Sequence, residues 1–344
     1  MSRTTPAAVF VQPLAVQHAA GADPATLACA VVDGHRIAQP EVLGEAPQEP
    51  IPVFSDPARE GDGYAARMER LLGDSAARLR ERLATAEPAA AVLLPPGPHR
   101  PGACWARRDR LVGELVERVP ALRRVRWWRP QGAMAPLQLL HRAVQAVVER
   151  RLTSILIGGL DACAAPAACA DPRVRRQCLP AVDGPAAADG AAFLLLHGDR
   201  GGGAADVRLR RFALGGPPEQ PGAWQRVLQT VVPEAEEGGD RAELHGFGRT
   251  PAERHAWANA RRLVPALRRE PLAARHLVWR ALGFAGAATL PLQLVAAAGL
   301  LRVASGPQRV LLTAVGGGVA GALELRQPGE GGGEAGGSRG EASA

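Results

Sequence analysis

Few residues of this 344-residue chain have the types and spacing that catalysis or metal binding requires. The sequence contains no G-x-S-x-G motif, no phosphate-binding loop and no cluster with metal-ligand spacing. Gly316, Gly318 and Gly321 match a dinucleotide fingerprint, but ALELRQ and a Gly-rich tail follow where that fingerprint needs a helix. We therefore expect neither a bound cofactor nor a metal ion.

The five cysteines do not indicate a metal site or a disulfide framework. Their positions include no C-x-x-C pair, and AAPAA separates Cys163 from Cys169. Such spacing without a nearby His suits zinc poorly. We interpret the cysteines as buried or idle thiols of a reducing compartment: Cys29, Cys104, Cys163, Cys169 and Cys178.

The strongest pattern is Arg129–Asp161, which reads as a turn, an apolar helix and a buried strand. Apolar residues recur at helical spacing over Leu137–Val148, and Thr153–Leu160 is a β-branched run without polar alternation. A nucleophile often occupies the turn before such a helix, because the helix N-terminus stabilises negative charge. Here the turn reads GAMA around Ala133, and none of these side chains can attack a substrate.

Composition and apolar segments limit the partners and the location. All 41 basic residues are Arg, but they are interleaved with Asp and Glu, and only 4% of residues are aromatic. Nucleic-acid binding usually adds aromatic stacking surfaces to positive charge, so we do not expect it. The N-terminus lacks a signal-peptide pattern, and the longest apolar segment, Ala285–Leu301, is too short to span a membrane. We predict a cytoplasmic protein without a membrane partner.

Further elements surround the central pattern in two successive halves of similar order. In the first half, the predicted strands and helices are separated by irregular segments at 36–62 and 171–189, and Asp189 with Gly190 is read as a turn. The strands are Ala7–Val11, Ala89–Leu94, Val125–Arg129 and Ala191–Leu196, and the helices are Pro24–Val32, Tyr64–Ala84 and Arg107–Val119.

The second half repeats this alternation after a Gly-rich link near 198–206. Val207–Phe212 is expected to pair with Ala191–Leu196 as a hairpin, and His276–Arg280 to be a short extended piece. The remaining strands are Ala242–His245, Arg309–Val315 and Ala320–Leu325, and the helices are Gly222–Val232, Pro251–Leu267 and Gly286–Leu301.

Five segments in one order carry a family resemblance: IGGLDAC, VDGPAAADGAAFLLL, LHGFGRTPAE, ALGFAGAATLPLQLVAAAGLL and VLLTAVGGGVAGALEL. Together they resemble the β-ketoacyl synthase family of the thiolase-fold superfamily over residues 7–326. The resemblance implies an α/β fold of thiolase-like, five-layer αβαβα type with two duplicated halves. We place these halves at residues 1–200 and 201–326, followed by a disordered Gly-rich tail at 327–344.

The resemblance also implies that the active site is degenerate. The family uses a nucleophilic Cys at the helix N-terminus, two His and a Lys. His245 matches the first His, whereas the Cys position falls at or beside Ala133, the second His on Phe284 and the Lys near Trp279. Without a thiolate no covalent acyl intermediate forms, and Phe284 would fill and dry the pocket that the second His occupies. We therefore expect condensing activity to be lost.

Four further residues are candidates for the wall of an acyl pocket. Gln131 and Met134 flank the position of the missing Cys, and many chain-length factors have Gln in that region. Gly316 and Gly317 belong to a Gly cluster whose backbone, in the resembled family, passes close to the active site.

Three interpretations of function follow from the resemblance. The first is a chain-length-factor-like partner subunit of an active ketosynthase in fatty acid or polyketide biosynthesis, working with an acyl carrier protein. The second is a divergent acyltransferase with a site rebuilt around His245, although a lone His at a strand end is more often structural. The third is a scaffold without an acyl pocket.

The resemblance also predicts a dimer, either with a second copy or with a ketosynthase. The strand Val125–Arg129 matches the strand that pairs across the dimer axis in this superfamily. Trp127 and Trp128 are adjacent, so in a strand they point to opposite faces, which one core could not easily bury together. The alternative is that both lie in the interior, between the layers of the fold. An apolar edge strand favours pairing, and Trp is common at interface hot spots.

Overall fold

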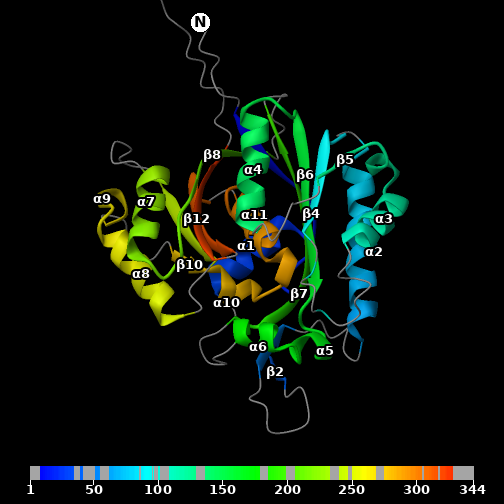
Figure 1. Cartoon of the computed structure of the whole chain (residues 1–344), viewed down its shortest axis with the longest axis horizontal. Coiled ribbons are helices and arrows are strands. Elements are labelled where there is room, and N and C mark those ends of the chain that lie inside the picture. Colours follow the sequence, from blue (N-terminus) through cyan, green and yellow to red (C-terminus); the bar gives the residue numbers. More distant parts are fainter. Residues whose placement is uncertain are drawn as a thin grey trace, which may run out of the picture.

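The fold has five layers, in which helices and sheets alternate (Figure 1). It is seen in a computed structural model of the chain, which describes residues 8–34, 39–41, 51–54, 62–84, 87–94, 96, 100, 108–128, 136–178, 185–198, 206–232, 240–246, 250–268, 275–303, 306–316 and 318–327. Two sheet halves enclose a central helical layer, and each is covered on its outer face by further helices.

The sheet of the first half runs in the order β5-β4-β6-β7-β1. β4 is parallel to β5 and β6, while β7 is antiparallel to β6 and β1. The strands are β1 (Val9–His18), β4 (Ala90–Leu94), β5 (Arg126–Trp127), β6 (Ser154–Ala162) and β7 (Ala187–His197).

The sheet of the second half runs β10-β9-β11-β12-β8, which repeats the order and the strand directions of the first half. β9 is parallel to β10 and β11, while β12 is antiparallel to β11 and β8. The strands are β8 (Val207–Leu214), β9 (Arg241–Gly246), β10 (Arg275–Leu277), β11 (Arg309–Gly316) and β12 (Val319–Arg326). Two stretches with little sequence similarity therefore fold to the same topology.

Each outer layer packs on the alternate side chains of its sheet. Leu156 and Leu160 of β6 face α2 (Tyr64–Arg82) and α3 (Arg108–Arg118), whereas Ile155 and Ile157 face the central layer. On the other side, α7 (Pro221–Val231) and α8 (Pro251–Arg262) pack on Leu311 of β11. α2 and its C-cap bury one apolar stripe against the sheet of the first half: Met68, Leu71, Leu72, Leu79 and Leu83.

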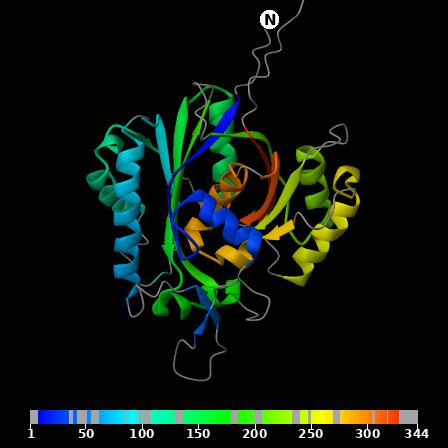
Figure 2. The same cartoon turned by 180° about the vertical axis from the view of Figure 1, so that it is seen from behind.

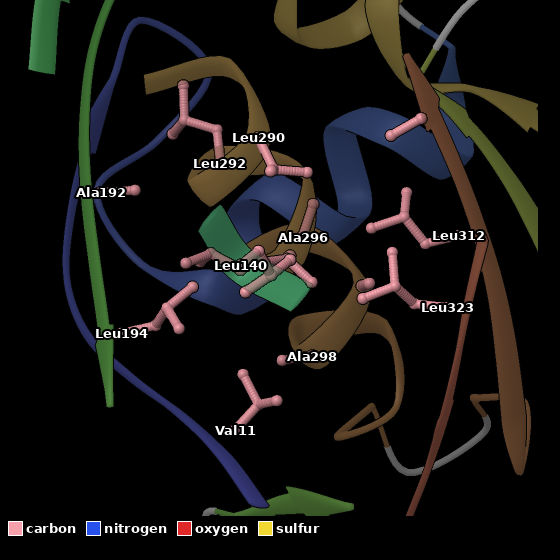
Figure 3. Packing of buried hydrophobic residues seen from close by; sticks show 14 of the residues in the cluster. Val11, Leu140, Ala192, Leu194, Leu290, Leu292, Ala296, Ala298, Leu312 and Leu323 are labelled. Carbon is pink, nitrogen blue, oxygen red and sulfur yellow. The ribbon is translucent and has the colours of Figure 1, made fainter. Parts of the chain in front are cut away.

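The central layer holds the two apolar helices that the sequence predicts at Leu137–Val148 and Gly286–Leu301. α11 (Thr289–Leu300) is buried from Leu290 to Leu300, and α4 (Pro136–Val148) buries the face that includes Leu140 and Val144. Figure 3 shows Leu140, Ala296 and Ala298 between Leu194 on one sheet and Leu312 and Leu323 on the other. Burying one Leu side chain contributes roughly 1.5–3 kcal/mol, so this layer stabilises both halves at once.

The predicted β7–β8 hairpin is wrong, because β1 lies between these strands. β1 pairs with β7 along most of its length and with β8 at its start, so that Phe10 lies opposite His197 on one side and Arg208 on the other. β1 also extends to His18, seven residues beyond the end of the strand predicted over Ala7–Val11. The N-terminal strand therefore joins the two sheets into one continuous path.

Four segments contain regular structure that the sequence prediction described differently. Part of the segment at 36–62 forms β2 (Gln39–Glu41) and β3 (Ile51–Phe54), and β3 also pairs with β7. Part of the segment at 171–189 forms α6 (Pro172–Cys178), preceded by α5 (Pro166–Cys169), and Pro is favourable at a helix start.

The other two segments differ because of Pro and Gly. The helix predicted over Pro251–Leu267 is two helices, α8 and α9 (Pro265–Arg268), since Pro265 cannot donate a backbone hydrogen bond. The piece predicted as extended is β10 followed by α10 (Val278–Leu282), which ends at Gly283 with φ of +63°. β5 is also shorter than the strand predicted over Val125–Arg129.

Within the described ranges, no helix combines the length and the apolar character that crossing a membrane requires.

Candidate functional site

The start of α4, where the family nucleophile would lie, faces the C-terminal end of β11 and the start of β12. A Cβ atom built on Gly321 would lie 3.2 Å from Leu137 Cδ1, and one built on Gly316 would lie 3.6 Å from Leu137 Cγ. Glycine at these positions lets the hairpin approach the helix. Gly316 is therefore beside the first turn of α4, whereas the other predicted positions of this site lie outside the described residues: Gln131, Ala133, Met134 and Gly317.

The start of α11 has the same relation to the first half. A 3-10 turn, Gly286–Ala288, precedes α11 and lies against the end of β6. A Cβ atom on Gly159 would lie 2.3 Å from the carbonyl oxygen of Ala287. Thus α4 begins against the end of β11, and α11 begins against the end of β6. β6 and β11 hold equivalent places in the two sheets, so the two contacts match.

His245 lies at the end of β9, on the face that packs against α8. Its Nδ1 is 2.9 Å from Thr313 Oγ1, and its ring makes an edge contact with Trp257 at 4.2 Å between centroids. The neighbouring Leu244 faces the central layer. Because side chains of a strand alternate, His245 points to the outer helical layer, away from α4.

The surroundings of His245 favour a neutral imidazole. Burial lowers its pKa to about 3, and the charges of Arg275, Arg261 and His276 act in the same direction. The Thr313 hydroxyl also lies 3.3 Å from the carbonyl oxygen of Leu244, so it can donate there and accept from His245 Nδ1. The imidazole is thus held in one orientation and is neutral near pH 7, so it cannot act as an imidazolium acid.

A buried ion pair accompanies His245 on the same face. Arg261 Nη2 of α8 lies 2.7 Å from Glu243 Oε1, and Arg275 Nε lies 3.7 Å from Glu243 Oε2. Glu243 Oε2 is in turn 3.5 Å from His245 Nε2. This cluster fixes α8 and β10 to β9.

Phe284 and Trp279, which match the lost His and Lys positions, lie in different surroundings from His245. Phe284 bridges to β7 through its backbone, donating to the carbonyl of Ala186 at 2.7 Å, and its ring packs against the cluster that contains Val53 and Cys169. Trp279 is buried in α10, with the Arg280 guanidinium 5.3 Å from its ring centroid. None of the contacts of His245 described above involves Phe284 or Trp279.

A buried polar cluster that the sequence did not predict lies where β6 ends and β7 begins. Asp161 is fully buried and lies 3.1 Å from both Arg100 Nε and the Tyr64 hydroxyl. Arg100 also reaches Asp171 at 3.2 Å and Cys163 Sγ at 3.3 Å. One guanidinium therefore joins two carboxylates and a thiol from three segments.

Asp189 extends this cluster on β7. Its Oδ2 lies 2.9 Å from Arg67 Nη1 of α2, and its Oδ1 accepts from the backbone N–H of Ala164 at 2.9 Å. The interpretation of Asp189 as a turn residue is wrong, because it is a buried strand residue with an ion pair. An Asp inside a buried apolar run was the available signal, since such a charge needs a partner.

The protonation of this cluster does not favour a nucleophile. Burial raises the pKa of the Cys163 thiol well above its usual range, and the nearby Asp161 charge adds to this effect. Burial and Asp161 also raise the pKa of Tyr64, while burial raises that of Asp161 against the opposing charge of Arg100. Cys163 is thus a protonated, inaccessible thiol, and its neighbours Cys169 and Cys178 are buried thiols as well.

No metal-binding group forms among these side chains: in the described part of the chain, three or more His, Cys, Asp or Glu residues nowhere gather with suitable geometry.

Comparisons with known proteins establish the fold. Neither a protein-family model nor a curated protein sequence matches the chain. The ishigamide ketosynthase/chain length factor is 19% identical with a TM-score of 0.62, over 94% of this chain and 100% of that one. A ketosynthase from module 6 of the bacillaene synthase of Bacillus subtilis 168 is 12% identical with a TM-score of 0.64, over 94% and 72% of the two chains.

A third similar structure is a chain of a complex described as a type II PKS acyl-carrier protein with its ketosynthase bound to the hexaketide. It is 12% identical with a TM-score of 0.61, over 94% of this chain and 100% of that one. The similarity extends over nearly the whole chain and confirms the thiolase-like ketosynthase fold that the sequence predicted.

Proposed function

We propose that this protein is a non-catalytic, chain-length-factor-like partner subunit of an active ketosynthase in fatty acid or polyketide biosynthesis. The observation that carries the proposal is a ketosynthase-like fold over nearly the whole chain. The resemblance places the nucleophilic Cys of the family at or beside Ala133, and the sequence has no Cys there. A subunit that contributes its shape to a complex, and no chemistry, needs the whole fold but not the nucleophile. One of the similar structures is itself described as a ketosynthase/chain length factor.

The side chains near the expected site support a role without chemistry. The imidazole of His245 is neutral and bonded to Thr313, and the thiol of Cys163 is buried and protonated. A covalent acyl intermediate needs an accessible thiolate or an activated hydroxyl with a base beside it. The described residues offer neither next to α4.

An acyl chain could still be accommodated beside α4. Leu137, Gly316 and Gly321 meet at the start of the helix, where the two glycines keep the backbone of the β11–β12 hairpin close to Leu137. In the proposal, this junction forms one wall of an acyl tunnel shared with the ketosynthase. Gln131, Met134 and Gly317 would line the same wall.

The edge of β5 supports association through the first half. β5 pairs with β4, and no second strand of the described residues covers its other edge. The backbone N–H of Trp128 donates to Ala91 of β4 at 2.8 Å, so the backbone groups of Trp127 point to the open edge. Such an edge can add a strand from a partner. The complex, with an acyl carrier protein delivering substrate, would work in the cytoplasm.

The test uses the purified chain with an active ketosynthase and malonyl carrier protein. Alone, the protein should neither acquire an acyl group from an acyl thioester, by intact mass, nor release CO₂ from malonyl carrier protein. Mixed with its ketosynthase partner, it should form a stable heterodimer and change the length of the product. Stoichiometric acylation of the protein alone, at any residue, would contradict the proposal and favour a rebuilt acyltransferase.

A further inference from the structure

A polar cavity of about 420 Å³ lies outside the site at the start of α4. It is formed where β1, the start of α1 (Pro24–Asp33), the end of α2 and the residue after the C-cap of α11 meet (Figure 2). Three arginines line it: Arg78 and Arg82 from α2, and Arg302 after α11. Nothing in the proposed ketosynthase-like role uses this group of cations.

Arg302 is the most unusual of the three. Its Nε and Nη2 atoms are buried and have no hydrogen-bond acceptor among the described residues. Burial lowers its pKa, and the like charge of Arg82 lowers it further against the opposite charge of Asp206. A buried guanidinium donor without an acceptor costs free energy, and two neighbouring cations repel each other.

The carboxylates around the cavity do not neutralise Arg302 directly. Asp206 lies 3.1 Å from His197 Nε2, and the Asp23 carboxylate caps α1 by accepting from the Thr26 backbone at 2.9 Å. Glu81 lines the cavity but is exposed, with no ion partner in the described part of the chain. The Nη1 of Arg78 donates to the carbonyl of Ala22, which fixes its guanidinium at the wall.

We propose that this cavity binds the phosphate group of a small phosphorylated molecule, held by Arg302, Arg82 and Arg78. Guanidinium groups donate two parallel hydrogen bonds to phosphate oxygens, and the charge of a phosphate would offset the positive charges of Arg302, Arg82 and Arg78. The volume lies in the range of small-molecule sites, so it has room for a phosphate ester as well as the free anion. The inference does not depend on the proposed function.

The experiment is calorimetric titration of the protein with inorganic phosphate, inorganic pyrophosphate and AMP, each at constant ionic strength set by chloride. Saturable binding at one site is expected. Arg302→Gln and Arg82→Gln should each weaken it about tenfold or more, the loss expected for charge-assisted hydrogen bonds. Arg208→Gln, an exposed arginine of β8 outside this cavity, is the matched control and should bind as the unmodified protein does.

The Glu81→Gln variant should change the affinity for pyrophosphate in the opposite direction from the arginine variants. It removes the one free carboxylate of the cavity wall, so pyrophosphate should bind more tightly. Tighter binding of AMP than of inorganic phosphate identifies the ligand as a phosphate ester, and the reverse order identifies the free anion. The proposal is wrong if neither pyrophosphate nor AMP binds saturably, or if both arginine variants keep full affinity. Circular dichroism of Arg82→Gln, an exposed position, separates loss of binding from loss of folding.

Discussion

A Cβ atom built on Gly286 would lie 1.9 Å from Oδ2 of the buried Asp161. Gly286 is the first residue of the turn before α11, and Asp161 lies near the end of β6. Because α11 belongs to the second half and β6 to the first, this contact joins the two halves of the fold. It also closes the Asp161–Arg100–Tyr64 cluster on one side. Glycine is required here for two reasons. A side chain would clash with Asp161, and φ at Gly286 is +50°, where a residue with a side chain is strained.

Gly286→Ala should lower the free energy of unfolding by about 2–4 kcal/mol, through the clash with Asp161 and the strained φ together. Gly34→Ala is the matched control. Gly34 ends α1 with φ of +63°, but its Cβ would meet nothing within 4 Å. That variant should lose only about 1–2 kcal/mol in urea unfolding, the cost of the left-handed conformation. Equal losses for the two variants would show that the contact with Asp161 does not matter.

Arg100→Met should destabilise the protein by about 3–5 kcal/mol, because it leaves the Asp161 carboxylate buried without its cation. The double variant Arg100→Met with Asp161→Asn should recover part of this loss, since the amide carries no charge. Urea unfolding of the two single variants and the double variant gives the coupling energy. If the losses simply add, the ion pair is not the cause.

The five-layer architecture could be predicted from the sequence because its elements have clear apolar patterns. Tyr64–Arg82 has a single apolar stripe, and Leu290–Leu300 is apolar on all sides, which together specify an outer and a central helix. The position of β1 could not be predicted, because strand order depends on contacts between distant segments. A strand at Val207 follows Leu196 closely in sequence, yet β1 lies between the two strands.

The candidate site was predicted less completely than the fold. Gly316 was expected near the start of α4, and it lies beside Leu137. Asp161 and Asp189 were not expected to form a cluster, because no local pattern says which of many arginines will meet a buried carboxylate. The sequence also could not predict whether His245 faces the central layer or the outer helices, because this depends on the register of β9 between β10 and β11.

His245 should make the stability of the protein depend on pH. Its pKa is about 3 when folded, against a usual value of 6.5, so the unfolded chain binds the proton first as the pH falls. The free energy of unfolding is therefore highest above pH 6.5 and decreases below it, by about 2 kcal/mol at pH 5 from this group. The His245→Gln variant should lose less of its free energy of unfolding between a pH above 6.5 and pH 5, as measured by urea unfolding at each pH. His255→Gln, on the exposed side of α8, is the control and should follow the unmodified protein.

The last prediction concerns the dimer and the two tryptophans of β5. The structure confirms that they face opposite ways: Trp127 packs with the outer cluster that includes α2 and α3, and Trp128 with the central cluster. Both remain partly exposed in the single chain, as expected if a partner covers the rest. Trp127→Ala combined with Trp128→Ala should therefore weaken association by tenfold or more, about 1.4 kcal/mol or above.

Sedimentation velocity at micromolar concentration, for the protein alone and with an active ketosynthase, measures this effect. Trp257→Ala removes a partly buried indole from α8, far along the sheet path from β5, so it should leave association unchanged while testing general loss of packing. Thermal unfolding of both variants separates a loosened dimer from a loosened monomer. If the unmodified protein sediments as a monomer both alone and with the ketosynthase, the partner-subunit proposal is wrong, because a wall of a shared tunnel requires stable contact.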